Sequence, residues 1–186
     1  RERMFSAKHY RPLDARRLLR TAGTPFLVVP HHTMLLQPTD WSLSDRGAFR
    51  LAEVYSNHGS SEETGTWWRH PNQGGRDYGQ TTGARAHDYA SALRAGLRLG
   101  VSGASDEHAG RPGLSGLTCV LSERLERAAL FDGLMARRTF ATSGARMLLE
   151  LEVAGVAQGG EARLAPGAPV AARLAVHGSA EQERVE

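Results

Sequence analysis

The sequence of 186 residues has few cysteines, no long hydrophobic run and no run of like charges, and each absence excludes a class of protein. Cysteine occurs once, at Cys119, which excludes an internal disulfide and a cysteine-based metal cluster. Cys119 stands in an apolar run, so we expect a buried, unreactive thiol. No hydrophobic run is long enough to cross a membrane, and no run of like charges accompanies the net charge of +3. We therefore expect a globular protein that binds neither nucleic acid nor membrane, and its oligomeric state stays open.

Neither end of the chain is typical of a natural terminus. Residues 1–5 have the composition of the middle of a helix, and residues 183–186 that of a shortened strand. We expect a fragment of a longer protein. No signal peptide is visible, so the compartment stays open, with the cytoplasm as the default.

Strand-like and helix-like patterns alternate through most of the chain. Helices are predicted at residues 12–22, 87–98 and 123–137, and apolar strands at residues 25–30, 51–55 and 117–121, with a very short one after Gly100. This alternation is typical of a parallel α/β architecture with right-handed crossovers. From about Met147 the hydrophobic period changes to two, in residues 148–153 and 169–177. That change predicts the start of an antiparallel β domain.

Side chains with metal-binding chemistry follow three of the predicted strands. They are His31 and His32 after the first, Glu53 and His58 at the second, and Asp106 and His108 in the Gly-rich turn 103–113. Imidazole and carboxylate together suit zinc, manganese or iron. Residues two apart on an extended segment point the same way, so Asp106 and His108 could both reach one ion, or one could bridge two.

Each cluster alone also has an ordinary structural explanation. A pair of histidines such as His31 and His32 is more often a surface or capping feature. Glu53 could be a buried acid paired with an arginine, and Asp106 could be a turn residue or a helix N-cap. The coincidence of three such clusters, each close to a strand end, favours a metal site.

Four segments carry a resemblance to a known family. They are VVPHHT at 28–33, EVYSNHGSSE at 53–62, YASALRAGLRLGVSGASDEHAGRPG at 89–113 and ALFDGLMARRTFATSG at 129–144. Together they resemble the DUF3604 family, a branch of the PHP (polymerase and histidinol phosphatase) superfamily of metal-dependent phosphoesterases. The resemblance extends over about residues 25–180, and its most specific parts are the second segment and the end of the third.

The resemblance implies a fold and a cofactor. The fold would be the C-terminal part of a PHP-type distorted (β/α)7 barrel in residues 1–144, without its N-terminal strands. The truncated start of a β-sandwich-like domain would follow in residues 145–186. Two or three divalent ions of zinc, manganese or iron would bind at the C-terminal ends of the barrel strands. The superfamily's first motif, His-x-His, is absent, so this chain alone is expected to form an incomplete site.

The resemblance also implies roles for individual residues. Asp106 and His108 match the terminal Asp-x-His ligands. His31 matches the histidine after the central strand, but His32 stands where the superfamily has proline, so either histidine could be the ligand. His58 is favoured as a further ligand. Glu53 would either support a ligand without binding the ion directly or contact the substrate.

The function implied for the intact protein is that of a metal-dependent hydrolase, a phosphoesterase that uses metal-activated water on a small-molecule phosphoester, and the activity of this chain alone stays open. His58 or His108 could protonate the leaving group. Arg111 could contact the phosphate, and a surface arginine in a turn is an equally good explanation of it. Two alternatives stay open: a metal hydrolase that cleaves other bonds, and a non-catalytic metal-binding or interaction module.

Overall fold

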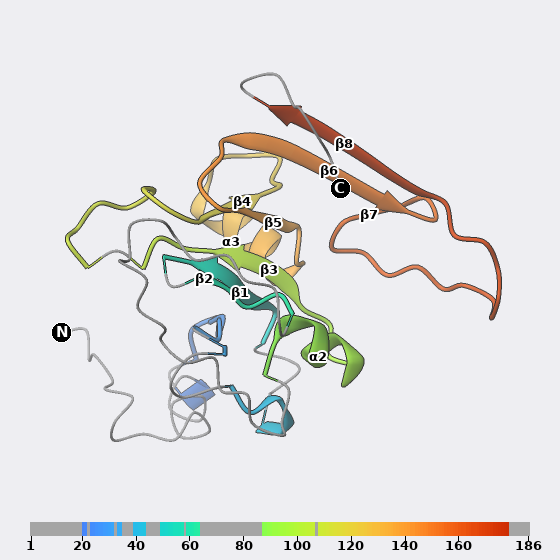
Figure 1. The fold of residues 1–186 in the computed structure, drawn as a ribbon, viewed down its shortest axis with the longest axis horizontal. Coiled ribbons are helices and arrows are strands. Elements are labelled where there is room, and N and C mark those ends of the chain that lie inside the picture. The colour runs from blue at the N-terminus through green and yellow to red at the C-terminus, as the bar shows by residue number, and fades with distance from the viewer. Residues whose placement is uncertain are drawn as a thin grey trace.

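The computed structural model describes residues 20–21, 23–31, 33–34, 39–43, 49–57, 59–63, 87–106 and 108–178. The elements in chain order are η1 (Trp41–Leu43), β1 (Leu51–Ser56), β2 (Gly59–Ser60), α2 (Tyr89–Arg94), β3 (Gly100–Gly103), β4 (Leu117–Val120), α3 (Arg127–Met135), β5 (Thr139–Thr142), β6 (Met147–Val153), β7 (Val156–Ala157) and β8 (Ala172–Gly178) (Figure 1). The strands form three small sheets, with the orders β2-β1-β3, β4-β5 and β7-β6-β8.

The strand β1 lies at the centre of the first sheet and is buried along almost its whole length. It pairs in parallel with β3 on one side, and Val28 forms a parallel bridge with Phe49 just before β1 begins. An apolar run is the pattern expected of a strand that is covered on both faces. The core around it is formed by buried apolar side chains from several segments: Trp41, Phe49, Ala52, Ala92, Leu97 and Leu99.

The helix α2 is short because its two ends are defined by capping residues. The Asp88 side chain accepts a hydrogen bond of 2.6 Å from the backbone N–H of Ser91, which starts the helix. Gly96, at φ +80°, turns the chain out of the helix just after its end. The Tyr89 hydroxyl donates to the carbonyl of Leu99 at 2.7 Å, which holds the helix against the chain that leads into β3.

The strands β4 and β5 form an antiparallel pair that packs beside β3. The helix α3 connects them and approaches β4 at Gly133, where a Cβ atom would lie 2.7 Å from Cγ1 of Val120. The Thr139 hydroxyl of β5 donates to the carbonyl of Val101 in β3 at 2.7 Å. These contacts join the second sheet to the first.

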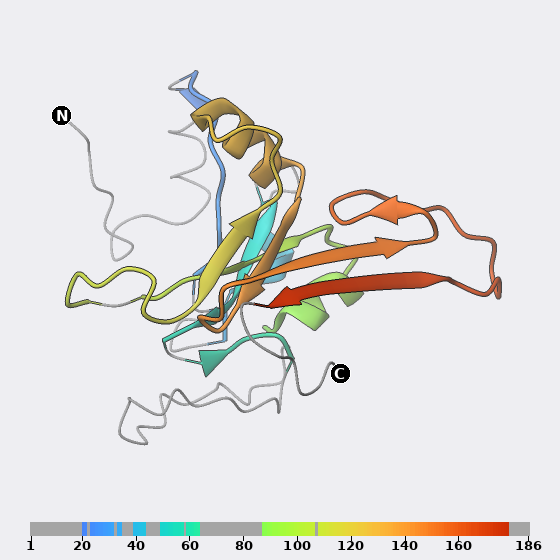
Figure 2. The same ribbon diagram turned by 90° about the horizontal axis from the view of Figure 1, so that it is seen from above.

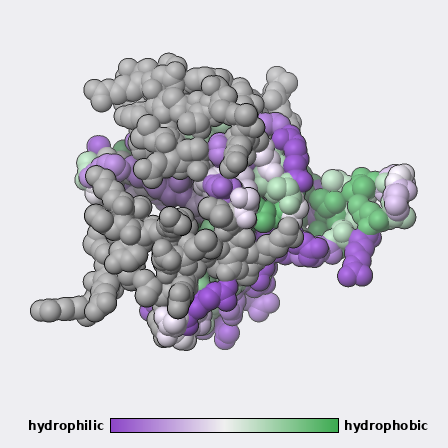
Figure 3. Space-filling model, turned by 90° about the horizontal axis from the view of Figure 1, so that it is seen from below, coloured by the Kyte–Doolittle hydropathy of each residue, from purple (hydrophilic) through white to green (hydrophobic). Residues whose placement is uncertain are grey.

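Residues 147–178 form a separate arm, which we call the C-terminal arm. β6 and β8 pair antiparallel from Met147–Gly178 to Val153–Ala172 without a break in register. Figure 2 shows this ribbon projecting from the rest of the molecule. Leu148, Leu151 and Leu174 are exposed, and Figure 3 shows hydrophobic side chains along the projecting part.

The expected fold, part of a distorted (β/α)7 barrel, is wrong. The described residues contain two short helices of six and nine residues and three small sheets. A barrel of this type needs consecutive parallel strands, whereas β4 and β5 are antiparallel although a helix connects them. The predicted strand at 25–30 contributes only the bridge at Val28. Within the described ranges, two helices of this length cannot cover the outside of a barrel.

Other expectations can be compared element by element. The predicted strands at 51–55, 117–121 and 148–153 correspond to β1, β4 and β6. The predicted helices at 87–98 and 123–137 are shorter in the structure, and the one at 12–22 lies mostly outside the described residues. The division into two domains at residue 144 stays a prediction. None of the helices in the described ranges combines the length and the hydropathy that a bilayer crossing requires.

Candidate functional site

The candidate site forms where parallel backbone segments end side by side. The backbone N–H of Glu53 donates to the carbonyl of Pro30 at 3.2 Å, and that of Ala104 donates to the carbonyl of Tyr55 at 2.9 Å. The segment that ends at His31, the strand β1 and the loop after β3 are therefore held together at one edge. Carboxyl ends of neighbouring parallel strands are a common place for binding sites in α/β proteins.

His31 lies between two carboxylates. Its Nδ1 atom is 3.0 Å from Oε1 and 2.9 Å from Oε2 of Glu53, and its Nε2 atom is 3.5 Å from Oδ1 of Asp106. Glu53 is buried, whereas half of the His31 side chain is exposed. The hydrogen bond with Glu53 raises the pKa of His31; burial opposes this, and the negative charges of Glu53 and Asp106 add to it. Glu53 thus fixes the ring so that Nε2 faces Asp106.

His108 lies close to the same carboxylate oxygen of Asp106 as His31 does. Its Nε2 atom is 3.4 Å from Oδ1 of Asp106, and its side chain is 84% exposed, against 12% for Asp106. Asp106 has φ +42°, in the left-handed region that aspartate tolerates better than most residues. The two side chains lie close together, although the backbone at Asp106 is left-handed and not extended. That both reach one ion stays a prediction.

The donor types suit a divalent ion, and the two distances to Asp106 are compatible with a shared ion. Two imidazole nitrogens and one carboxylate oxygen suit zinc, manganese or iron. Ligand atoms around a tetrahedral zinc ion lie about 3.4 Å apart, since each bond is about 2.1 Å long. Both histidine–Asp106 distances agree with that spacing. However, no group of three or more His, Cys, Asp or Glu side chains in the described ranges is arranged to hold an ion by itself.

Two residues that the sequence interpretation missed shape the loop that carries Asp106. The Thr118 hydroxyl donates to the carbonyl of Gly103 at 2.7 Å and accepts from its N–H at 3.0 Å. Gly116 has no room for a side chain, because a Cβ atom would lie 2.7 Å from the carbonyl oxygen of Ala104 and 3.0 Å from Cδ1 of Tyr55. These contacts hold the two ends of the loop 104–116 together. A glycine directly before a predicted strand is the sequence signal for such a close approach.

The remaining predicted site residues are not all described. His32 and His58 lie outside the described residues, so their roles as ligand or proton donor stay predictions. Arg111 lies on the same loop as Asp106 and is exposed. Its role as an anion contact also stays a prediction. The structure thus brings together His31, Glu53, Asp106 and His108 of the predicted set.

These features define a protein of small mixed and antiparallel sheets with an imidazole–carboxylate cluster at a strand edge. Residues 75–158 match the model of a family described as a protein of unknown function, DUF3604. The match includes Asp106 and His108 and supports the assignment to this family. No curated protein matches the chain, and no solved structure matches it.

Proposed function

We propose that the protein is a metal-dependent hydrolase of phosphoesters, related in its chemistry to the PHP superfamily. The observation that carries the proposal is the position of one Asp106 oxygen, 3.5 Å from Nε2 of His31 and 3.4 Å from Nε2 of His108. These three residues would be metal ligands. The preference for phosphoesters rests on the motif resemblance and not on a contact in the structure.

The side chains around this oxygen have separate tasks in the proposal. When bound, two or three divalent ions supply a water that ionises near neutral pH and positive charge to oppose a phosphoryl group. Glu53 holds Nδ1 of His31 and so keeps Nε2 available. His108 is the most exposed member, so it could protonate a leaving group in a state in which it binds no ion. Arg111 would contact the phosphate, and His32 or His58 would supply a further ligand.

A second candidate is a metal-binding module without catalysis. The observation that favours a non-catalytic metal-binding or interaction module is the projecting C-terminal arm (Figure 2), whose exposed Leu148, Leu151 and Leu174 offer a surface for a partner. A hydrolase that cleaves bonds other than phosphoesters would use the same cluster. Measuring the metal content distinguishes a chain that binds metal from one that does not. A substrate screen then distinguishes the phosphoesterase from the non-catalytic module and from a hydrolase of other bonds.

The test begins with metal content measured by inductively coupled plasma mass spectrometry after the chain is loaded with zinc or manganese and desalted. Parent protein is compared with Asp106→Asn and with His177→Ala. His177 is a matched control, because its Nε2 atom lies 3.6 Å from Oε2 of Glu150 in the C-terminal arm, a similar pair away from the site.

We expect at least one bound ion in the parent and in the His177 variant, and loss of most of it in the Asp106 variant. The intact protein, loaded in the same way, should then hydrolyse p-nitrophenyl phosphate or its bis ester above the rate of its Asp106 variant. Metal binding without hydrolysis of either ester would favour the binding module. A folded parent that takes up neither metal would overturn both candidates.

A further inference from the structure

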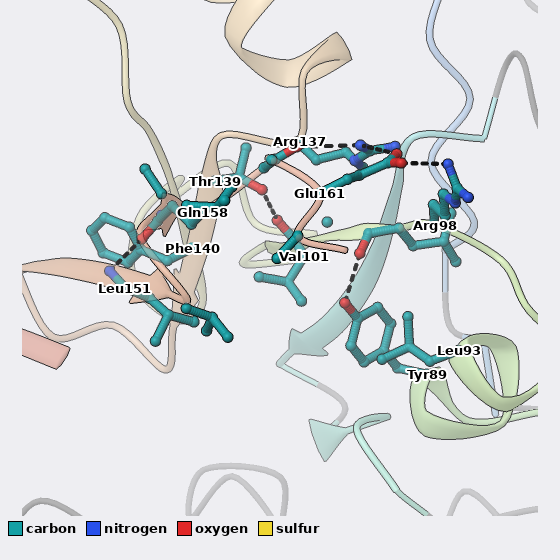
Figure 4. A pocket seen from close by; sticks show the side chains of 18 of the residues that line it. Tyr89, Leu93, Arg98, Val101, Arg137, Thr139, Phe140, Leu151, Gln158 and Glu161 are labelled. Atoms are coloured by element: carbon teal, nitrogen blue, oxygen red, sulfur yellow. Dashed lines mark hydrogen bonds and ion pairs between the residues drawn. The ribbon is translucent and has the colours of Figure 1, made fainter. Parts of the chain in front are cut away.

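A cavity of about 800 Å³ lies between the helix α2 with the strands β3 and β5 on one side and the strands β6 and β7 of the C-terminal arm on the other (Figure 4). This volume is in the range of small-molecule sites in proteins. Its lining contains none of His31, Glu53, Asp106 and His108. The cavity is therefore separate from the imidazole–carboxylate cluster.

The walls of the cavity are mainly apolar. Residues from five elements line it, among them Tyr89, Leu93, Val101, Phe140, Leu151 and Val156. Leu93 and Leu151 are both partly exposed although they are large and apolar. Leaving such surface in contact with water is unfavourable by about 25 cal/mol for each Å². An apolar group that fills the cavity would remove it from water.

Two hydroxyl groups of the inner walls are satisfied within the protein, whereas the buried Nε2 atom of Gln158, which also lines the cavity, has no hydrogen-bond partner among the described residues. The Tyr89 hydroxyl donates to the carbonyl of Leu99, and the Thr139 hydroxyl donates to that of Val101. Figure 4 shows both bonds along the wall. Nε2 of Gln158 is thus a donor that a ligand could meet inside the cavity. A ligand with polar groups throughout would still lose more bonds to water than this one donor replaces.

The rim of the cavity carries two arginines and one glutamate. Nη1 of Arg98 is 2.5 Å from Oε2 of Glu161. Nη2 of Arg137 is 3.1 Å from Oε1 of Glu161 and 3.2 Å from the carbonyl of Gly159. The pKa of Glu161 is lowered by the hydrogen bond from Arg98 and, further, by Arg137, so the carboxylate stays charged. One negative and two positive charges leave the rim with a net charge of +1.

Arg98 is the rim residue best placed to meet a ligand. Its side chain is 71% exposed, whereas that of Arg137 is 15% exposed and held by the arm. Within the described part of the chain, Arg98 makes its polar contact with Glu161 through Nη1, and a guanidinium has further N–H donors. Two such donors suit a carboxylate.

We propose that this cavity binds an amphipathic monocarboxylate, with its apolar body between α2 and the C-terminal arm and its carboxylate at Arg98. The charge of the rim disfavours a cationic amphiphile, and the apolar walls disfavour a small polar anion. This site is independent of the proposed hydrolase activity.

Decanoate tests the proposal by isothermal titration calorimetry on the whole chain, well below its micelle concentration and with EDTA present. Decanol and decyltrimethylammonium serve as neutral and cationic probes of the same chain length. We expect one decanoate per chain, bound at least tenfold more tightly than either. The Asp106→Asn variant should bind decanoate as the parent does, which separates this site from the metal cluster.

Three variants complete the test, each checked for folding by circular dichroism. Arg98→Ala should weaken decanoate binding about tenfold, and Arg98→Lys should retain most of it. Arg173→Ala, which removes an exposed arginine of β8 outside the lining, should change nothing. Equal binding of the three probes, an unchanged affinity in Arg98→Ala, or no saturable binding by the folded parent would each overturn the proposal.

Discussion

The sheet around β1 and the C-terminal arm use strands in opposite ways. β1 is buried at almost every position, and its pairing with β3 shifts in register between Glu53 and Tyr55. β6 and β8 pair without interruption and keep apolar side chains exposed. The candidate site lies beside the irregular pairing, where backbone irregularity can direct a side chain to a new position.

The same two residue types illustrate the difference. His177 of β8 and Glu150 of β6 are diagonal neighbours across the two strands, and both are well exposed. His31 and Glu53 are closer, and Glu53 is buried. An exposed pair of this kind contributes little to stability. Because Glu53 is buried and its position is fixed, its hydrogen bond also fixes the orientation of the His31 imidazole.

Truncation of a leucine in each region should give the largest contrast. Leu51→Ala removes a side chain that is 1% exposed and should lower the free energy of unfolding by about 3 kcal/mol. Leu174→Ala, at a position 46% exposed, should lower it by less than about 1 kcal/mol. Urea unfolding curves of the two variants measure both values. Equal losses would mean that the arm is packed as tightly as the first sheet.

A substitution at the glycine that closes the site loop comes next. Gly116→Ala places a methyl group against the backbone of Ala104 and should lower the free energy of unfolding by about 2 kcal/mol. It should also weaken metal uptake, because the loop carries Asp106. Gly167→Ala is the control in the arm: nothing lies near its Cβ position, and its φ of +76° alone causes strain of about 1 kcal/mol. Unchanged metal uptake in Gly116→Ala would contradict the role of Gly116 in positioning Asp106.

Replacing the glutamate of each histidine–glutamate pair by glutamine should weaken zinc binding for one pair only. Glu53→Gln removes the carboxylate that orients His31 and should weaken zinc binding about tenfold or more. Glu150→Gln should leave zinc binding unchanged, since its partner His177 lies in the arm. Competition with a chromophoric chelator measures both affinities. Equal affinities in the two variants would contradict the orienting role of Glu53.

The smallest expected effect concerns the contact between the arm and the rest of the chain. Because the pKa of Glu161 is lowered in the folded protein, its ion pairs stabilise the fold at neutral pH. That stabilisation is lost as the pH falls through the lowered pKa. In Arg98→Ala the carboxyl titration of Glu161, followed by carbon NMR, should move up toward its ordinary range. A titration that does not move would show that Arg98 contributes nothing to it.

The sequence predicted strands better than their arrangement. Apolar or alternating patterns identified β1, β4 and β6, because these patterns depend on local burial. The barrel was wrong because strand direction depends on tertiary pairing, and periodicity does not record that β4 and β5 run antiparallel. The length of α2 was overestimated because Asp88 and Gly96 set its ends inside the apolar pattern.

The candidate site was predictable in its members and not in its geometry. His31, Glu53, Asp106 and His108 were singled out by their positions near strand ends, and the structure places them together. The left-handed turn at Asp106 has no clear signal in the sequence, and the contact of Glu53 with Nδ1 of His31 joins residues far apart in the chain. Their roles as metal ligands stay a prediction.

The parallel pairing of β1 with β3 also has a consequence for the order of folding. Leu51 pairs with Gly100 across a long intervening segment, whereas Val153 pairs with Ala172 across a short one. Closing the longer loop is entropically less favourable, and distant pairings slow folding. The arm can therefore form early, while the histidines and carboxylates meet only after the slow step. If the proposed metal site forms, uptake of metal during refolding would report when these distant contacts are made.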